Sequence, residues 1–197
     1  MNLARQTAIA GIGATEFSKN AGRTPMQLAT ECSLKACEDA GLDPAMINGI
    51  SVFSAEKNTE IEVARNLGIP ELTFFSMIHH GGGAPGGVIQ QASMAVHSGV
   101  ADYVLVYRAF NERSWHRFGE GVQGRHQSPE AFDVSFSWSS PFGLLTPASW
   151  VAMYATRYMH QYGATSEDFG TIAVTDRKHA ATNPAAFFYE KPRTLDA

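Results

Sequence analysis

The chain has 197 residues, of which 44% are hydrophobic and 17% are charged, and its formal net charge is −4. This composition is typical of a globular chain with a sizeable core. The sequence has no basic stripe, which argues against nucleic acid as a partner, and no apolar run near the roughly 20 residues that span a bilayer. Its opening lacks the charged-then-apolar order of a signal peptide, so we expect no membrane association and a cytoplasmic location.

The first elements expected along the chain are a strand and a helix. Residues 7–12 are apolar and predict a strand. Thr24, Pro25 and Gln27 then form a capping-box pattern with proline at the first helical position. The helix that follows ends at Gly41 and has a narrow face of small residues that permits close packing. These are Ala29, Cys32, Ser33, Ala36 and Ala40.

The pattern then alternates again. We expect a short strand over 50–53, and a helix over 61–67 behind a second capping box and before Gly68. Residues 72–78 and 101–109 are apolar nearly throughout, as in parallel strands covered on both faces. This alternation predicts a layered α/β sheet with right-handed crossovers.

The most informative stretch is residues 76–88, Ser-Met-Ile-His-His-Gly-Gly-Gly-Ala-Pro-Gly-Gly-Val. It predicts a buried strand that turns through glycines into a helix with Pro85 at its first position. Glycines 81–83 allow a positive φ or a close approach to a ligand. Free backbone N–H groups and the positive end of the helix dipole would meet at this bend, an arrangement that suits a developing oxyanion.

His79 and His80 in this bend leave several roles open. We expect no metal site, because neighbouring residues point apart on extended backbone and no further ligand follows at helical spacing. An acid, base or polarising role fits an imidazole beside an oxyanion site. Alternatively, one histidine only holds the bend through hydrogen bonds to backbone. A dinucleotide site at Gly11 and Gly13 is not supported, because Glu16 stands where a third glycine is needed.

These motifs resemble the thiolase superfamily. In thiolases the same strand-to-helix turn is followed by a buried helix, a Gly-x-Ala-Asp turn and an apolar strand, which match residues 99–102 and 103–107 here. The opening residues 7–18 and the segment 154–184 resemble the lipid-transfer-protein branch. The resemblance implies a thiolase-like layered α/β fold, an α-β-α half with a buried central helix and an inserted loop region.

The resemblance covers only the first half of a thiolase subunit. It implies a core over 1–110, followed over 111–197 by a loop domain and the start of the continuation. Either the chain is part of a longer one, or a second polypeptide supplies the rest. Dimerisation through the strand 101–109 or its neighbour, as a thiolase-type homodimer, is also implied by resemblance.

Where thiolases carry the nucleophilic cysteine, this chain has Gly83 or, with a shift of one residue, Gly82. Without a thiolate, covalent acyl transfer is not expected. A backbone oxyanion hole can still stabilise a thioester enolate, as retro-aldol cleavage of a β-hydroxyacyl-CoA requires. The branch includes aldolases of steroid side-chain degradation that act with an OB-fold and zinc-ribbon (DUF35) partner. We therefore expect a lyase that uses no bound cofactor, with coenzyme A as part of the substrate.

Further site residues are implied by the loop region of thiolases, which shapes the acyl pocket and contributes to coenzyme A binding. Here Arg113, Arg117 and Arg125 are candidates for the phosphates. Phe142, Gly143 and Leu144 fall where thiolases line the pocket. The structural alternative is a surface arginine in each case and a loop packed by its own aromatic residues.

Two other functions remain open at this point. The chain could be a non-catalytic scaffold that only binds acyl-CoA and its partner. It could instead be an acetyl-CoA acyltransferase that uses Cys32 or Cys37, although both lie on the first helix, far in sequence from the bend. The general base is not marked either: Tyr107, Tyr154 and Tyr158 have no motif, and an ordinary tyrosine is a poor base.

Overall fold

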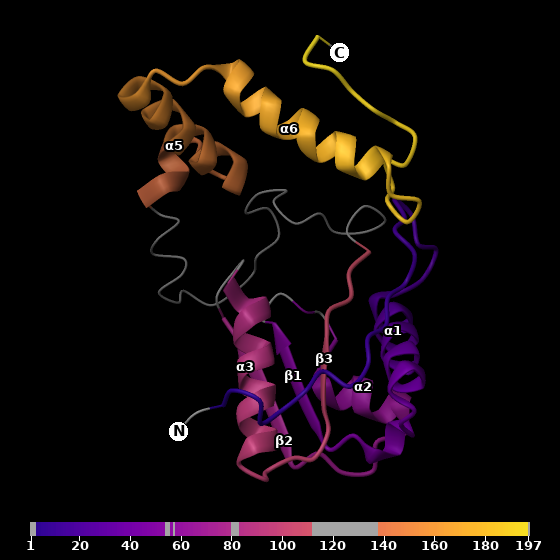
Figure 1. The fold of residues 1–197 in the computed structure, drawn as a ribbon. Helices are drawn as coiled ribbons and strands as arrows, with labels where there is room; N and C mark the ends of the chain where they lie inside the picture. The colour runs from indigo at the N-terminus through magenta and orange to yellow at the C-terminus, as the bar shows by residue number, and fades with distance from the viewer. Residues whose placement is uncertain (1–2, 54–55, 57, 80–82, 112–137, 197) are drawn as a thin grey trace. The chain divides into compact units, whose positions relative to one another are not determined.

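A computed structural model describes residues 3–53, 56, 58–79, 83–111 and 138–196 (Figure 1). The chain forms two compact units, Met1–Ser114 and Trp115–Ala197. No helix in these ranges is long and apolar enough to cross a membrane.

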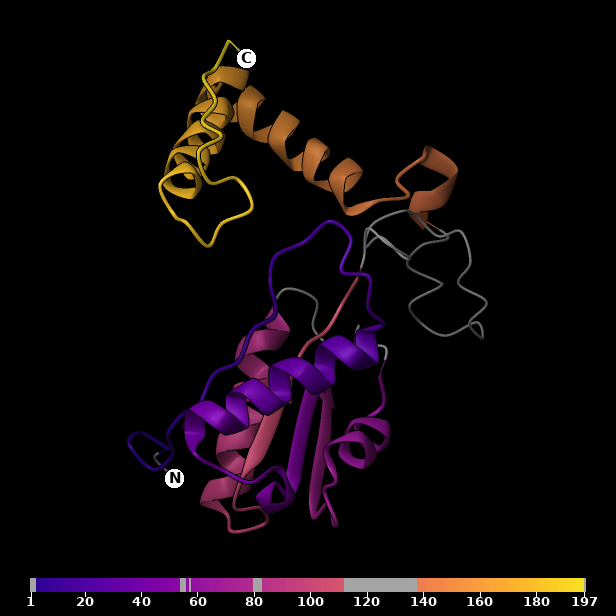
Figure 2. The ribbon, with the colours of Figure 1, turned by 90° about the vertical axis from the view of Figure 1, so that its right-hand side faces the viewer.

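The first unit is built on a parallel sheet with strand order β2-β1-β3. Its strands are β1 (Gly49–Phe53), β2 (Phe74–Ile78) and β3 (Val104–Tyr107). Helix α3 (Ala84–His97) packs against all three strands from one face. Helices α1 (Pro25–Ala40) and α2 (Glu60–Leu67) cover the other face, as Figures 1 and 2 show. The layered α/β fold expected from the sequence is confirmed.

The helix ends follow the local signals in the sequence. Thr24 Oγ1 accepts from Gln27 N at 3.2 Å, and the Gln27 side chain accepts from Thr24 N at 2.9 Å. The same reciprocal pair joins Thr59 and Glu62 at the start of α2. Gly41 and Gly68 end the two helices at positive φ, which glycine adopts without a steric penalty. Both capping boxes and both helix ends are therefore confirmed.

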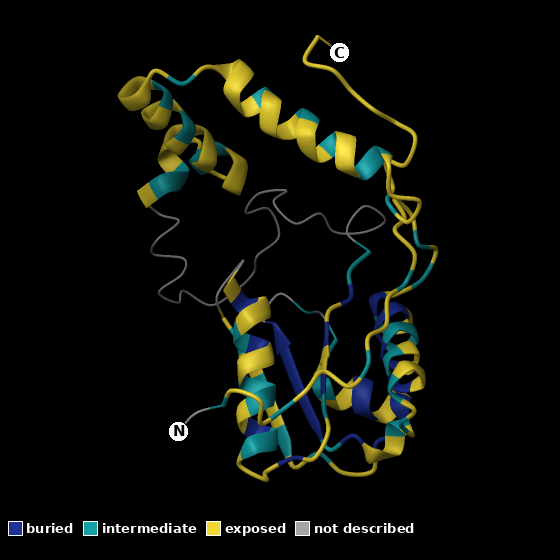
Figure 3. Ribbon diagram, in the orientation of Figure 1, coloured by how far each residue is buried: buried dark blue, intermediate teal, exposed yellow. Residues whose placement is uncertain are grey.

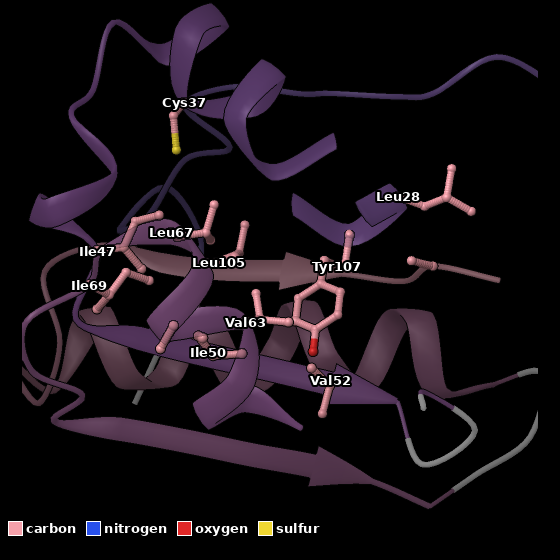
Figure 4. Packing of buried hydrophobic residues seen from close by; sticks show 13 residues of the cluster. Leu28, Cys37, Ile47, Ile50, Val52, Val63, Leu67, Ile69, Leu105 and Tyr107 are labelled. Atoms are coloured by element: carbon pink, nitrogen blue, oxygen red, sulfur yellow. The ribbon is translucent and has the colours of Figure 1, made fainter. Parts of the chain in front are cut away.

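The core lies between the sheet and helices α1 and α2 (Figure 4). Ile50 and Val52 of the central strand are fully buried there, together with Val63 of α2. Figure 3 shows that β1 is buried along its whole length, since it has a neighbouring strand on each side and helices on both faces. On the α3 side, the hydroxyls of Ser51 and Ser76 satisfy one another at 2.8 Å. Every residue of the central strand is thus buried.

The strand expected over residues 7–12 is wrong: this segment is extended but joins no ladder. A β-strand needs ladder partners for its backbone N–H and C=O groups, and this segment is paired with none of the described strands. A cavity of about 1100 Å³ is lined by this segment, by β3 and by faces of α1 and α3. Ile9 and Ile12 are consequently 72% and 75% exposed. Apolar composition predicted the extended backbone correctly but could not supply the pairing.

Two glycines explain how this segment lies against α1. A Cβ on Gly11 would come within 2.3 Å of the Ala36 carbonyl oxygen, and one on Gly13 within 2.1 Å of the Cys32 carbonyl oxygen. Ile12 N also donates to the Asp39 carboxylate at 2.9 Å. The small-residue face of α1 therefore permits close packing, as expected, and the two glycines are needed for contact with that helix.

The second unit contains η3 (Ser140–Phe142), α5 (Pro147–Tyr162) and α6 (Ser166–Ala181). Thr146 caps α5 in a reciprocal pair with Ser149. Trp150 Nε1 donates to the Leu144 carbonyl at 3.1 Å, which ties the helix to the turn before it. The rings of Tyr158 and Tyr162 are in tilted contact, with their centroids 4.8 Å apart. None of the described residues of α5 or α6 is buried within the unit (Figure 3).

Candidate active site at the carboxyl edge of the sheet

The three parallel strands end at one edge of the sheet. Phe53 is in register with Ile78, and Val52 with both Met77 and Tyr107. The carboxyl ends of β1, β2 and β3 therefore lie side by side. Ligands of open α/β sheets bind at such carboxyl edges. His79, the first described residue after β2, follows β2 at this edge.

The start of α3 differs from the starts of α1, α2, α5 and α6. Helices α1, α2, α5 and α6 each begin with a capping box. Helix α3 begins after Gly83 with no side-chain cap. The first N–H groups of a helix have no intrahelical acceptor, so those of Ala84 and Gly86 at the start of α3 are candidate donors to another group, whereas Pro85 has no N–H. An anionic oxygen placed there would also meet the positive end of the helix dipole.

The structure corrects one expectation about the glycines. Gly83 has φ −81°, which other residues adopt readily, and a Cβ added there would meet no atom within 4 Å. It is therefore not required by a positive φ, and the space beside it is open. Pro85 is the second residue of the helix, one position later than predicted. Gly82 and His80 lie outside the described residues, and His79 is exposed directly after β2.

Both cysteines lie on α1, across the sheet from α3 (Figure 1). Cys37 belongs to the buried core in Figure 4, and Cys32 is half-buried and donates to the Ala29 carbonyl at 3.3 Å. Burial raises the pKa of both thiols above the ordinary value. A buried thiol with a raised pKa is a poor nucleophile. The structure thus gives no support to acyl transfer through Cys32 or Cys37.

Glu56 is a residue that sequence reasoning missed. Its carboxylate accepts from Ala109 N at 2.7 Å and from Asn58 Nδ2 at 2.8 Å. In the same loop, the Asn58 carbonyl accepts a hydrogen bond from Tyr107 Oη at 3.0 Å. These bonds join the loop after β1 to the chain leaving β3, although the partners are 49 to 53 residues apart. Glu56 and Tyr107 therefore fix two of the three connections at the carboxyl edge.

The same contacts argue against Tyr107 as the general base. Its side chain is buried among Val52 and Val63 in Figure 4, and its hydroxyl is already a donor. Burial raises its pKa well above the ordinary value, and the negative charge of Glu56 raises it further. The phenol stays protonated at neutral pH. Tyr154 and Tyr158 are exposed in the second unit.

Arg108 is a second residue that the sequence did not mark. Its guanidinium carbon lies 4.3 Å from the ring centroid of Phe110 and 5.2 Å from that of Phe53. Phe53 ends β1 and Phe110 follows β3, so the side chain reaches from one strand end to the other. The two rings hold an exposed cation at the edge where the bend lies.

The motif of residues 99–102 has a structural role at the opposite edge. Gly99 adopts φ +74° after α3. Asn48 Oδ1 accepts from Asp102 N at 2.8 Å, and Asn48 Nδ2 donates to the Asp102 carboxylate at 3.0 Å. This pair aligns the starts of β1 and β3. The Asp of the motif therefore positions the sheet and does not belong to the candidate site.

The remaining predicted site residues all lie outside the described part of the first unit. Arg113, Arg117 and Arg125 lie outside the described residues. Phe142, Gly143 and Leu144 form the end of η3 and the turn after it in the second unit, where Gly143 has φ +74°. Within the described ranges, no three His, Cys, Asp or Glu side chains are grouped as metal ligands.

Comparison with known proteins gives close relatives, although no family model matches the chain. The chain is 60% identical over 189 residues to a steroid side-chain-cleaving aldolase of Thermomonospora curvata. The aligned region covers 96% of this chain and 48% of that protein. The chain is 56% identical over 194 residues to a 17-hydroxy-3-oxo-4-pregnene-20-carboxyl-CoA lyase of Mycobacterium tuberculosis. The aligned region covers 98% of this chain and 50% of that protein.

A solved structure decides the fold. The Ltp2-ChsH2(DUF35) aldolase is 58% identical, superposes with a TM-score of 0.85 and covers 96% of this chain and 47% of the solved one. The chain is similar to steroid side-chain aldolases with a thiolase-like fold. The resemblance to the thiolase superfamily and its lipid-transfer-protein branch is thereby confirmed. The thiolase-like chain spans about half the length of the relatives it matches.

Proposed function

We propose that the protein carrying this thiolase-like chain is a carbon–carbon lyase that cleaves a β-hydroxyacyl-CoA thioester by a retro-aldol reaction. The observation that carries the proposal is 60% and 56% identity to two proteins named for this kind of cleavage, across nearly the whole chain. The bend without a cysteine adds independent chemical support, because retro-aldol cleavage needs an anion site and no sulfur nucleophile.

In the proposed reaction a base removes the proton of the β-hydroxyl group. The bond between the α and β carbons then breaks, a ketone leaves, and the electron pair passes to the thioester as an enolate. Main-chain donors at the start of α3 would bind the enolate oxygen, and protonation of the α carbon gives the shorter acyl-CoA. We assign the base to neither thiol nor to Tyr107, whose protons are held by raised pKa values.

The substrate and partners follow from the relatives as proposals. The lyase relative is named for a 17-hydroxy steroid carboxyl-CoA, so a steroid side-chain thioester is the proposed substrate class. The solved relative is named with a DUF35 protein, so a partner of that type is proposed here. A thiolase-type homodimer through the strand over 101–109 or its neighbour is also proposed, since β3 is an edge strand of the described sheet. Light scattering that showed only one copy in the complex would contradict the dimer. Coenzyme A enters as part of the substrate, without a separate cofactor.

The test is to incubate the full-length protein and its DUF35 partner with a 17-hydroxy steroid side-chain acyl-CoA. We expect free ketone and a shortened acyl-CoA by mass spectrometry. Omitting the partner from a parallel sample shows whether it is required. If the thioester stays bound and unchanged, the lyase hypothesis is wrong and the result favours a non-catalytic scaffold. Formation of acetoacetyl-CoA from acetyl-CoA, with no ketone, would indicate an acyltransferase instead.

A further inference from the structure

Arg108 lies on the face of the sheet that α3 covers. Leu105, Tyr107 and Ala109 belong to the core beneath α1 and α2. Successive residues of an extended chain point to opposite faces, which places Arg108 on the other side. Its contact with Phe53 agrees, because Phe53 and its register partner Ile78 share that face, and Ile78 is the side chain nearest to Gly87 of α3.

The side chain also extends across the sheet toward the bend. Neighbouring strands are about 4.8 Å apart, and β1 lies between β3 and β2. By reaching over Phe53, the guanidinium lies above the end of β1, one strand from the point where β2 gives way to His79. The cation is thus brought toward the bend from the far edge of the sheet.

Its position is held from two sides while its hydrogen-bonding capacity remains available. The rings of Phe53 and Phe110 contact the guanidinium group, and the Glu56 carboxylate accepts a hydrogen bond from the backbone N–H of Ala109, the next residue, at 2.7 Å. The ion pairs among described residues involve Arg23 and Lys35, and none involves Arg108. A guanidinium carries five N–H donors in a planar fork, which suits bidentate binding of phosphate or carboxylate oxygens.

We propose that Arg108 is a substrate-binding residue that contacts an anionic oxygen of the acyl-CoA at this edge. The inference rests on the proposed function, because it takes acyl-CoA as the ligand. The anionic oxygen belongs either to the phosphates of coenzyme A or to the enolate formed by cleavage. Phe53, Phe110 and Glu56 act through Arg108 and its backbone, so they are positioning residues.

The experiment compares Arg108→Gln and Arg108→Lys with unsubstituted protein, in the full-length protein with its partner. Arg65→Gln is the matched control, since Arg65 is exposed in the last turn of α2, away from the carboxyl edge. The measurements are the Kd of free coenzyme A by calorimetry, kcat and KM for the acyl-CoA, and Tm. The lysine variant keeps the charge without the fork and should recover part of any loss.

Contact with the phosphates predicts that Arg108→Gln raises the Kd of coenzyme A about tenfold and leaves kcat nearly unchanged. Contact with the enolate predicts an unchanged Kd and a kcat about tenfold lower. A lower Tm with unchanged Kd, KM and kcat would show that Arg108 only joins two strand ends, and would overturn the proposal. If the unsubstituted protein releases no ketone, the proposed function fails, and the Kd comparison alone then decides for or against Arg108.

Discussion

Replacing Ile50 with alanine is expected to lower the free energy of unfolding of the first unit by about 3 kcal/mol. Ile50 is 0% exposed at the centre of the sheet, beside Phe75 on β2 and Leu105 on β3. Truncating a buried isoleucine removes its burial energy and leaves a cavity that close-packed neighbours cannot fill. Because β1 underlies the candidate site, the same change should loosen the carboxyl edge.

Hydrogen exchange of the β1 amides is the appropriate measurement. All three tryptophans lie beyond residue 114, so their fluorescence would not report on the first unit. We expect the β1 amides to exchange about 100-fold faster in Ile50→Ala. Ile61→Ala is the control, since Ile61 is 53% exposed on α2 and its truncation should change the stability by less than about 0.5 kcal/mol. Equal effects of the two substitutions would contradict the assigned core.

Introducing a thiol at the bend, by Gly83→Cys, is expected to create a cysteine far more reactive than the two native ones. The φ of −81° and the open space beside Gly83 accept a side chain. The uncapped start of α3 would stabilise the thiolate and lower the pKa of the new thiol. The native thiols have raised pKa values, so they stay protonated at pH 7 and ionise only at higher pH.

The measurement is the rate of alkylation by iodoacetamide against pH, with the modified residue located by peptide mass spectrometry. At pH 7 the introduced thiol should react at least about tenfold faster than Cys32 or Cys37. Ser98→Cys is the matched control, because Ser98 is exposed at the opposite end of the same helix, where the dipole disfavours an anion. If both introduced thiols titrate alike, the start of α3 does not stabilise a negative charge, and the oxyanion site must lie elsewhere.

The features predictable from sequence were those determined by a few neighbouring residues. Thr24 with Gln27, and Thr59 with Glu62, form local hydrogen bonds that fix where α1 and α2 begin. The apolar runs before Gly83 and after Gly99 correctly predicted strands β2 and β3, although each strand is shorter than expected. The expectation that β2 is buried on both faces is wrong, because Phe75 is 66% and Met77 45% exposed within the described residues. Alternating apolar segments then sufficed for the layered architecture, because parallel strands require covering helices.

The features that escaped prediction depend on residues far apart in the chain. The segment 7–12 has the composition of a strand, but pairing is a property of its neighbours. Arg108 is positioned by contact with Phe53, which is 55 residues earlier in the chain. Glu56 joins the site through its hydrogen bond from Ala109 N. A lone arginine or glutamate in a sequence carries no such signal. The candidate site was therefore located from the bend, while the side chains around it required the structure.

The most direct test of the proposed function is the intact mass of the full-length protein during incubation with the proposed substrate, a 17-hydroxy steroid side-chain acyl-CoA, and the proposed DUF35 partner. Cleavage through an enolate at the bend predicts ketone release while the mass of the protein stays unchanged throughout. A gain equal to the acyl group, located on a cysteine by peptide mapping, would show a covalent thioester. That result would contradict the claim that this thiolase-like site works without a sulfur nucleophile.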